Sequence, residues 1–566
     1  MWNLIKILFI ISAVWQRGII GVEATKYTPN AFHISIQLND TFRLGEINFY
    51  REYEIPGSSV TTIEVRGTDE LWDVGFGIFQ THSFLYNITL SAKKSLRSPS
   101  VNAINGTNLG FNVHHNSTYF LHTNGGRRNV SVAVAFVVFK KTGAIPGSCN
   151  MVHPVEETPF LRVNILEDTV MVETPPAGSG VPRLDNMTCG TENFLYEFRY
   201  MYLARQDFSQ RSYFDSLRAL MVPRTIVELG NLVTKVPEYN LHQLYARYTS
   251  MGMFFTTLVM DGLGENITTA YVPAHSYGCS EQLTIHDCHI VESTSYMILL
   301  VLIMVLGACQ VILGRQLVYL RVIVNSFMIG GYLAFVIFCT VDDWDLKVII
   351  MIVGVIVFSV VWTTVWLQCH SVSNVADILG SFLNGYTVAC LVLYMFGDMK
   401  ILESESYYWM VFCLVIPSVS VLSFPLSRRG AIVNTALLGS TFMALTLLFM
   451  FDGNLHYAII NNWRRLKDKS FSQAILNPHL DIVDCFCIAV WLMAFASSIF
   501  IQTRLIDSGC ACWGPHNVRV LRFRDQEARP LIARLTKRDL GSDDVFLSPR
   551  SNSRFMRRFK RHSFFV

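Results

Sequence analysis

Seven long apolar stretches fill the second half of the chain and constrain its fold more than any other feature. We expect membrane spans at 296–313, 322–340, 348–367, 375–396, 408–426, 431–451 and 482–501, and none of them contains Lys or Arg. Stretches of about 20 apolar residues match the thickness of a bilayer. The sequence therefore predicts an all-α bundle of seven transmembrane helices over residues 291–503.

The first half of the chain has the features of an exported segment. Lys6 precedes a short apolar run, Ile7 to Trp15, and Val22-Glu23-Ala24 offers a cleavage site, so we expect a signal peptide over residues 1–24. Seven N-x-S/T sequons follow, all before residue 270, and they are typical of a glycosylated exterior segment. The candidate glycosylation sites are Asn39, Asn87, Asn105, Asn116, Asn129, Asn186 and Asn266.

The distribution of charge predicts the orientation in the membrane. An exported amino terminus and seven spans place the carboxyl terminus in the cytosol, and the tail over 504–566 carries 14 Lys or Arg against 6 Asp or Glu. Arg321 and Arg428 fall in expected cytosolic turns. We expect a multi-pass protein with its amino terminus extracellular or lumenal, most simply at the plasma membrane, with the endoplasmic reticulum as the alternative.

One loop does not follow this rule. Residues 452–481 are expected outside, yet they contain four basic side chains, Arg464, Arg465, Lys467 and Lys469. The segment YAIINNWRRL within this loop has the pattern of an amphipathic helix, which we expect to lie at the membrane surface.

The exterior segment reads mainly as β-structure. Runs such as HISIQL, SVTTIEV, FLYNITL and SVAVAFVVF are β-branched or alternating, and Gly, Asn and Pro clusters separate them. We expect a β-sandwich-rich ectodomain of two modules, 25–150 and 151–290, with a helix over Tyr213–Met221 inserted in the second. A single large sandwich is the alternative.

The cysteines divide into two groups. Cys149, Cys189, Cys279 and Cys288 lie in the exported segment, where an even number predicts two disulfides with three connectivities open. Cys510 and Cys512 lie just inside the membrane and are candidates for palmitoylation. The basic and aromatic segment Arg554–His562 in the tail is a candidate site for anionic lipid headgroups.

Polar residues inside the spans are the first places to look for function. Asn325, Thr363, Thr364, Asn384 and Asn434 are uncharged, which favours hydrogen-bonded helix contacts over a transport site. The three carboxylates Asp377, Asp481 and Asp484 fall near span ends, where an interfacial position accounts for them.

The sequence contains no motif of a catalytic, cofactor-binding or metal-binding site. The formal net charge of +3 also argues against a nucleic-acid partner. A receptor signature is missing as well, because Gln368-Cys369-His370 stands where D-R-Y would follow the third span. We therefore expect a protein without enzymatic activity or cofactor.

Several spaced stretches resemble the transmembrane seven superfamily member three family. They are AIPGSCN (Ala144–Asn150), YEFRYMYLARQDFSQRSYFDSLRALM (Tyr196–Met221), AYVPAHSYGCS (Ala270–Ser280), WRRLKDKSFSQAILN (Trp463–Asn477) and IAVWLMAF (Ile488–Phe495). The resemblance covers roughly residues 140–500 and includes counterparts of all four exterior cysteines.

This resemblance implies a non-enzymatic seven-span glycoprotein with a pro-survival role, which restrains endoplasmic-reticulum stress and the unfolded-protein response. Its ectodomain is expected to bind a lumenal or extracellular protein partner. A ligand-binding signalling receptor is the first alternative. A transporter that uses Asn384, Asn434 and Asp484 is the second.

Overall fold

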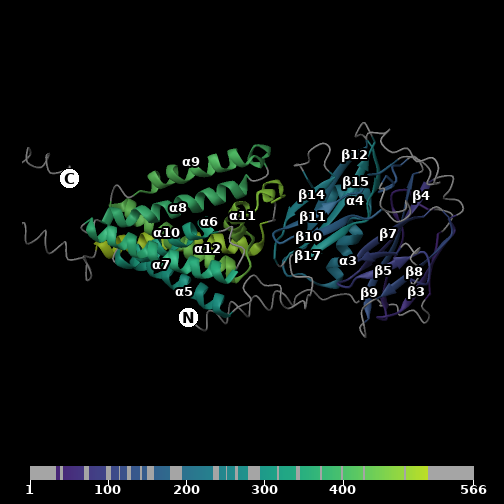
Figure 1. Ribbon diagram of the computed structural model, residues 1–566, viewed down its shortest axis with the longest axis horizontal. Coiled ribbons are helices and arrows are strands. Elements are labelled where there is room, and N and C mark those ends of the chain that lie inside the picture. Colours follow the sequence, from purple (N-terminus) through teal and green to yellow (C-terminus); the bar gives the residue numbers. More distant parts are fainter. Residues whose placement is uncertain are drawn as a thin grey trace, which may run out of the picture.

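The computed structural model places two halves end to end, a β half and a helical bundle (Figure 1). The structure describes residues 33–38, 42–68, 75–96, 103–113, 115–123, 129–140, 143–149, 159–178, 194–233, 241–249, 251–261, 266–277, 294–314, 318–338, 344–369, 373–396, 399–424, 428–476 and 480–507. The predicted signal peptide over 1–24 and nearly all of the basic tail lie outside these residues.

The first part of the β half is a sandwich of two sheets. A five-stranded sheet has the order β1-β3-β8-β5-β6 and faces a four-stranded sheet of order β2-β9-β4-β7. The strands are β1 (His33–Gln37), β2 (Ile47–Ile55), β3 (Val60–Arg66), β4 (Gly75–Ser83), β5 (Ile88–Ser91), β6 (Ala103–Gly106), β7 (Asn108–Val113), β8 (Ser117–Thr123) and β9 (Val130–Lys140). Ile63 and Leu121 from one sheet pack with Phe79 and Val134 from the other in a closed core.

A second sandwich follows. Its smaller sheet has the order β10-β11-β14, and its larger one has the order β13-β12-β15-β16, with β17 also paired to β15. The strands are β10 (Arg162–Ile165), β11 (Thr169–Glu173), β12 (Leu195–Tyr202), β13 (Asn231–Leu232), β14 (His242–Ala246), β15 (Gly252–Met260), β16 (Ile267–Ala270) and β17 (Ala274–Tyr277). The β half therefore contains two sandwiches rather than one.

A third core joins the two sandwiches. Alternate residues of β9 face opposite ways, so Val134 and Phe136 enter the first core while Ala135 and Val137 enter a core shared with the second sandwich. Phe254 of β15 contributes to the same shared core. Both faces of β9 are buried, which explains why its sequence is a continuous apolar run instead of an alternating one.

Two helices cover the shared core, where the sequence predicted one. Helix α3 (Gln210–Ala219) begins after Ser209, whose hydroxyl accepts a hydrogen bond from the Ser212 amide. The predicted Tyr213–Met221 helix must therefore be corrected at both ends. The chain turns before Pro223 and continues as α4 (Pro223–Leu229), because proline fits the first position of a helix but not its interior.

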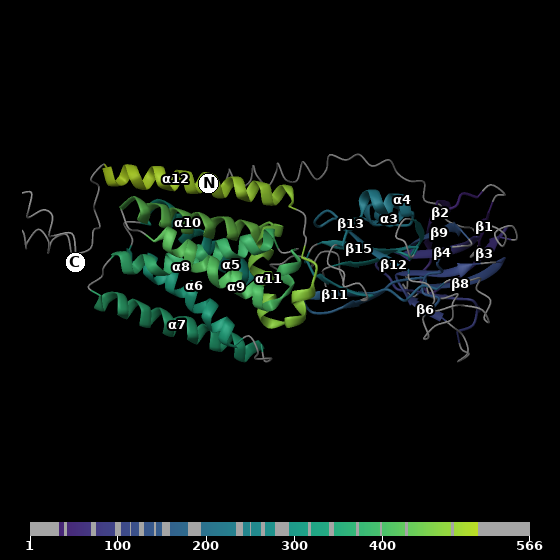
Figure 2. The same cartoon turned by 90° about the horizontal axis from the view of Figure 1, so that it is seen from above.

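Among the described residues, seven long helices form the bundle, and each overlaps one predicted span. They are α5 (Thr294–Leu313), α6 (Val318–Phe338), α7 (Trp344–Gln368), α8 (Ser373–Met395), α9 (Glu405–Ser423), α10 (Arg428–Met450) and α12 (Ile482–Asp507). Figure 2 shows α12 and α7 on opposite sides of the bundle. The short helices η2 (Lys400–Glu403), η3 (Asn454–His456), α11 (Tyr457–Lys467) and η4 (Lys469–Gln473) lie in the connections.

The bundle has the surface of a membrane protein. Leu422 of α9 is 86% exposed and Phe500 of α12 is 62% exposed, as expected for side chains that contact lipid. Over the described residues, four helices (α8, α9, α10 and α12) are long and apolar enough to cross a membrane. The described apolar parts of α5, α6 and α7 are shorter, so seven crossings stay a prediction.

Candidate functional site

In and around the bundle, buried polar side chains gather at two places, the junction with the β half and the opposite end of the bundle. At the junction, α11 lies between the bundle and the sheet that contains β10, β11 and β14 (Figure 1). The sequence correctly predicted a helix here. The β half covers this helix, and Tyr457, Ala458 and Asn461 are buried. Its expected position at the membrane surface stays a prediction.

One side of α11 is held by the turn between β10 and β11. The Nε atom of Arg464 lies 3.0 Å from the Oδ1 atom of Asp168, and Lys467 pairs with Glu167 and Asp168. Arg464 also donates to the carbonyl oxygen of Arg247 at 2.7 Å. Two of the four basic residues of this loop, Arg464 and Lys467, thus have carboxylate partners in the β half.

The next residue of α11 points the other way. Arg465 is 5% exposed, and its Nε atom donates to Glu405 Oε1 at 2.8 Å while Nη2 donates to the Leu402 carbonyl at 2.8 Å. Its guanidinium lies 3.8 Å from the ring centroid of Tyr408. Consecutive residues of a helix point about 100° apart, so the pair Arg464-Arg465 can bind both halves of the molecule.

Main-chain bonds extend the contact. Ile475, which follows η4, accepts a hydrogen bond from the Ala246 amide at 3.0 Å and donates to the Leu244 carbonyl at 2.9 Å. Strand β14 is the edge of its sheet, so a bundle loop completes hydrogen bonds that this edge would otherwise offer to solvent. Tyr248 adds a hydrogen bond from its hydroxyl to the Leu476 carbonyl at 2.7 Å.

A second loop of the β half contacts the end of the bundle that faces the β half. Arg205 binds Asn454, and Gln206 Nε2 donates to Asp452 Oδ2 at 2.8 Å. Gln206 and Asp452 both have left-handed backbones, with φ of 54° and 53°. This conformation is uncommon outside glycine and persists where the surroundings impose it, so two constrained residues meet across the junction.

The loop under Arg205 is itself closed by buried groups. Asp484, fully buried in the first turn of α12, accepts hydrogen bonds from the Leu455 amide at 2.9 Å and the Asp481 amide at 3.0 Å. Burial lowers the pKa of His456 to about 3, so this side chain is neutral at physiological pH. Its Nδ1 atom contacts the Gly453 carbonyl. These hydrogen bonds hold the loop in the conformation that Arg205 and Gln206 of the β half contact.

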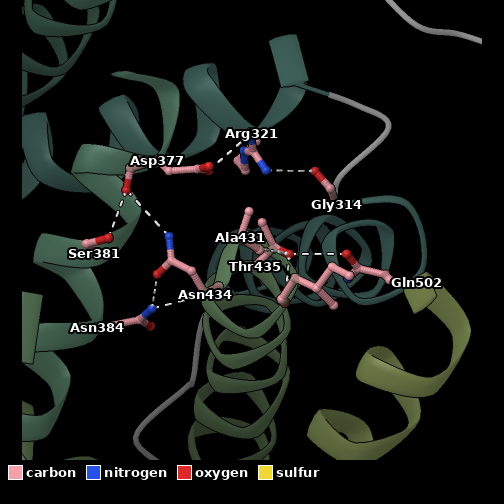
Figure 3. Close-up of polar contacts among 10 residues, drawn as sticks. Gly314, Arg321, Asp377, Ser381, Asn384, Ala431, Asn434, Thr435 and Gln502 are labelled. Carbon is pink, nitrogen blue, oxygen red and sulfur yellow. Dashed lines mark hydrogen bonds and ion pairs between the residues drawn. The ribbon is translucent and has the colours of Figure 1, made fainter. Parts of the chain in front are cut away.

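The opposite end of the bundle contains a buried ion pair (Figure 3). Arg321 Nη2 lies 3.0 Å from Asp377 Oδ1, and the two side chains are 2% and 0% exposed. Arg321 Nη1 also donates to the Gly314 carbonyl at 3.3 Å. One expectation is corrected here, because Arg321 lies inside α6 rather than in a turn. Asp377 lies near the start of α8, as expected, and is buried against Arg321, so that the two charges neutralise each other away from water.

Amide side chains continue this network. Asn384 Nδ2 donates to Asn434 Oδ1 at 2.6 Å, and Asn434 Nδ2 lies 3.4 Å from the Asp377 carbonyl oxygen (Figure 3). Thr435 donates to Gln502 Oε1 at 3.2 Å, which ties α10 to α12. We name this group of residues, with Arg321 and Asp377, the inner polar network.

The structure brings some of the predicted polar residues together and separates others. Asn384 and Asn434 are bonded, and Asn325 of α6 is buried beside them. Thr364 instead donates to its own helix at Val360 and is exposed. Asp484 lies past the far end of α10, and the 16 residues from Asn434 to Met450 correspond to about 24 Å. The trio proposed for transport does not form one site.

The candidate modification sites fall mostly on the surface. Asn87, Asn105, Asn116, Asn129 and Asn266 are exposed, whereas Asn39 and Asn186 lie outside the described residues. Cys149 is partly buried, and its amide donates to the Pro176 carbonyl at 3.1 Å. The other cysteines proposed for disulfides or palmitoylation, Cys189, Cys279, Cys288, Cys510 and Cys512, lie outside the described residues. Glycosylation, disulfide pairing and palmitoylation stay predictions.

Sequence reasoning missed the residues that join the halves. Asp168, Arg205, Gln206 and Glu405 make contacts at the junction. Arg205 and Gln206 lie within the quoted stretch Tyr196–Met221, but their contacts with the bundle were not predicted. A signal was present in the basic loop itself, since four basic side chains in a loop expected outside the membrane depart from the positive-inside rule. The loop could not show which carboxylates these are.

Three family models match the chain in order. They are described as the TM7SF3-like N-terminal immunoglobulin-like domain (residues 43–139), the TM7SF3-like second immunoglobulin-like domain (144–282) and the TM7S3/TM198-like domain (300–503). The human protein Transmembrane 7 superfamily member 3 is 23% identical over 474 residues, which are 81% of this chain and 82% of that relative. The protein of the same name from Rattus norvegicus is 22% identical over 474 residues, with 81% and 83% covered.

Proposed function

Because the chain belongs to the family of Transmembrane 7 superfamily member 3 proteins, we propose that it is a non-enzymatic membrane glycoprotein with a pro-survival role. In this proposal it restrains endoplasmic-reticulum stress and the unfolded-protein response. Its immunoglobulin-like half binds a lumenal or extracellular protein partner. Its amino terminus faces that side and its tail faces the cytosol, at the plasma membrane or, alternatively, in the endoplasmic reticulum.

The junction is the observation that supports this proposal best. The β half is not attached to the bundle by its connecting segment alone, because Arg464, Gln206 and Ile475 make contacts with residues more than 200 positions away. A partner that binds the β half would therefore act on a body continuous with the outer ends of the helices. This arrangement favours a function in which the two halves work as one unit.

The same junction also favours the second candidate, a ligand-binding signalling receptor. Each half contributes a constrained residue, Gln206 or Asp452, and strained positions often mark switch regions. A receptor would use the contact between them to pass a change in the β half to the helices. This candidate predicts a cytosolic response to a ligand of the β half.

The test is a stress-reporter assay in cells that lack the protein. Rescue is attempted with the full chain, with the ectodomain on an unrelated single span, and with residues 291–566 alone. A fourth rescue uses the full chain with Asp168→Arg, which places a positive charge against Arg464 and Lys467. Glu228→Arg is the matched control, since Glu228 makes only an exposed ion pair on α4.

We expect loss of the protein to raise reporter signal, and the full chain and the Glu228→Arg variant to restore it. The Asp168→Arg variant should reach the same surface abundance and fail to restore it. Rescue by the ectodomain on a foreign span would show that the junction is dispensable. An unchanged reporter in cells without the protein would refute the stress role and leave the receptor candidate, to be tested by G-protein coupling.

A further inference from the structure

The turn between β10 and β11 carries two exposed aliphatic side chains. Ile165 is 36% exposed and Leu166 is 45% exposed, and the Leu166 amide closes the turn with a hydrogen bond to the Thr169 carbonyl at 2.9 Å. Gly, Pro, Asn, Asp and Ser dominate turns, so two large apolar residues at this position are unusual. We name Ile165 and Leu166 the apolar tip.

Contacts on the two sides of α11 fix the level of the apolar tip along the bundle. Asp168 follows Leu166 by two residues and pairs with Arg464 at 3.0 Å. The next residue of α11, Arg465, pairs with Glu405 at 2.8 Å. Glu405 is the first residue of α9, and Figure 1 shows β10 and β11 next to the bundle. The apolar tip therefore lies near the level at which α9 begins.

The beginning of α9 also marks one boundary of the membrane. The 19 residues of this apolar helix correspond to roughly 29 Å, which is close to the thickness of the hydrocarbon core of a bilayer. Tyr407 is 52% exposed in its first turn, and the indole nitrogen of Trp409 donates to Glu405 Oε2 at 2.6 Å. Tyr and Trp are enriched where the hydrocarbon core meets the lipid headgroups. The apolar tip is therefore near the headgroup level.

The acidic residues next to the apolar tip have basic partners. Glu167 pairs with Lys467, and Asp168 pairs with both Lys467 and Arg464. An unpaired carboxylate would favour a position in water, whereas a paired one can approach an apolar environment at a lower cost. The turn thus brings two aliphatic side chains to the headgroup level together with carboxylates whose charge is neutralised.

We propose that the apolar tip inserts into the membrane interface and contacts the phospholipids beside α9. Its aliphatic side chains meet the upper acyl chains there, while the polar backbone of the turn stays among the headgroups. Ile401 of η2 extends this surface, because it is exposed and precedes Leu402, whose carbonyl accepts a hydrogen bond from Arg465. The inference goes beyond the proposed function and does not depend on it, since it requires only that the bundle lies in a membrane.

The first test maps lipid contacts of the full chain in phosphatidylcholine nanodiscs. Phospholipids with a diazirine either at the headgroup level or in the middle of the acyl chain are activated by light, and mass spectrometry locates the labels. We expect the headgroup-level probe to label Leu166 several-fold more than the mid-chain probe does. Leu414, exposed in the middle of α9, should show the reverse preference. Leu96, exposed in the first sandwich, should be labelled by neither probe.

A water-soluble diazirine applied to the same nanodiscs separates the other occupants. Labelling of Leu166 by this reagent as strongly as Leu96, with no label from the lipids, would mean that the apolar tip faces water. Protection of Leu166 from all three probes would mean that protein covers it, either a second copy of the chain or another partner. Each of these two results would overturn the proposal.

The second test asks whether the lipid contact stabilises the protein. Leu166→Gln keeps the length of the side chain and the charge of the turn, and Leu96→Gln is the matched control at an exposed site distant from the bundle. In nanodiscs, Leu166→Gln should lower the Tm of the full chain by about 2 °C, because an apolar contact is lost. Leu96→Gln should leave the Tm unchanged. Equal Tm values for the two variants would overturn the lipid contact of the apolar tip.

Discussion

At the scale of single residues, poorly solvated arginines of this protein form ion pairs with carboxylates. Arg464 and Arg465 are neighbours in the sequence, yet one binds Asp168 in the β half and the other binds Glu405 in the bundle. Each is shielded from solvent, with 13% and 5% of the side chain exposed, so removal of either partner leaves a poorly solvated charge. The two arginines hold the halves together because their side chains diverge around α11.

A glycosylation site offers a prediction at the same scale. Asn116 Oδ1 accepts hydrogen bonds from the amide and the hydroxyl of Thr68, at 3.2 Å and 3.1 Å. A glycan on Nδ2 would leave these bonds intact. Thr118, the third residue of the sequon, is exposed. We expect Thr118→Ala to remove one glycan without loss of stability, and Asn116→Ala to remove the same glycan and about 1 kcal/mol of stability.

Gel mobility before and after endoglycosidase treatment reports the glycan, and thermal unfolding reports the stability. Equal stabilities for the two variants would mean that the Asn116 side chain does not hold Thr68. Unchanged mobility of the Thr118→Ala variant would mean that Asn116 carries no glycan.

At the scale of elements, close contacts between small residues set the packing of the helices. Gly307 of α5 and Gly439 of α10 face each other, and a Cβ atom on Gly439 would lie 2.9 Å from the Val311 amide nitrogen and 3.0 Å from the Gly307 carbonyl oxygen. Small residues at such crossings let two backbones approach, which is the usual way that helices associate within a membrane. The β strands follow a different rule, as β9 shows, because there each face meets its own core.

Gly439→Ala tests this contact. Alanine normally stabilises a helix interior relative to glycine by about 1 kcal/mol, but here the methyl group would push α10 away from α5. We expect a net loss of about 1–3 kcal/mol, seen as a lower Tm of the full chain in detergent. Val433→Ile is the control, because Val433 lies on the same helix and is 43% exposed, so an added methyl group there should change little. A raised Tm for Gly439→Ala would show that the contact between α5 and α10 accommodates the added methyl group.

At the scale of the whole molecule, the two sandwiches are joined by polar as well as apolar contacts. His82 Nδ1 lies 2.8 Å from Asn108 Oδ1, and Asn108 Nδ2 lies 2.6 Å from His275 Nδ1. Tyr213 of α3 reaches Asn108 as well, at 3.2 Å. Burial lowers the pKa of His82 to about 4 and that of His275 to about 3. Both imidazoles are therefore neutral where they join the modules.

These two histidines predict acid sensitivity of the β half. Their pKa values are lower in the folded protein than the usual 6.5, so their contribution to stability is complete above pH 6.5 and declines as the pH falls toward 4 and 3. At pH 5 the expected loss is about 2 kcal/mol for His82, and less for His275, which is partly exposed.

Thermal unfolding of the full chain at pH 7.5, 6 and 5 measures this effect. The double variant His82→Gln and His275→Gln keeps amide groups in the network and cannot titrate. We expect its Tm to change less with pH than that of the native chain. An equal change in both proteins would assign the acid sensitivity to carboxylates elsewhere.

Much of the architecture could be predicted from the sequence because it is encoded in short windows. The apolar runs identified the helices of the bundle to within a few residues, and the β-branched runs identified strands in both sandwiches. The boundary of α3 was less accurate, because Ser209 and Pro223 decide its ends and the apolar pattern does not. Families of related sequences share such patterns, which is why the resemblance could also be recognised.

The contacts between these elements could be identified only from the tertiary structure. Lys467 meets Glu167 across 300 residues of sequence, and Arg321 meets Asp377 across a helix and two turns. No local window contains both partners of such a pair. The periodicity of apolar residues is enough to predict a β half and an apolar helical half, since burial of apolar surface follows that periodicity. The sequence did not show which charges neutralise each other, or that the two halves are in contact. Both depend on the fold, which brings distant residues within bonding distance.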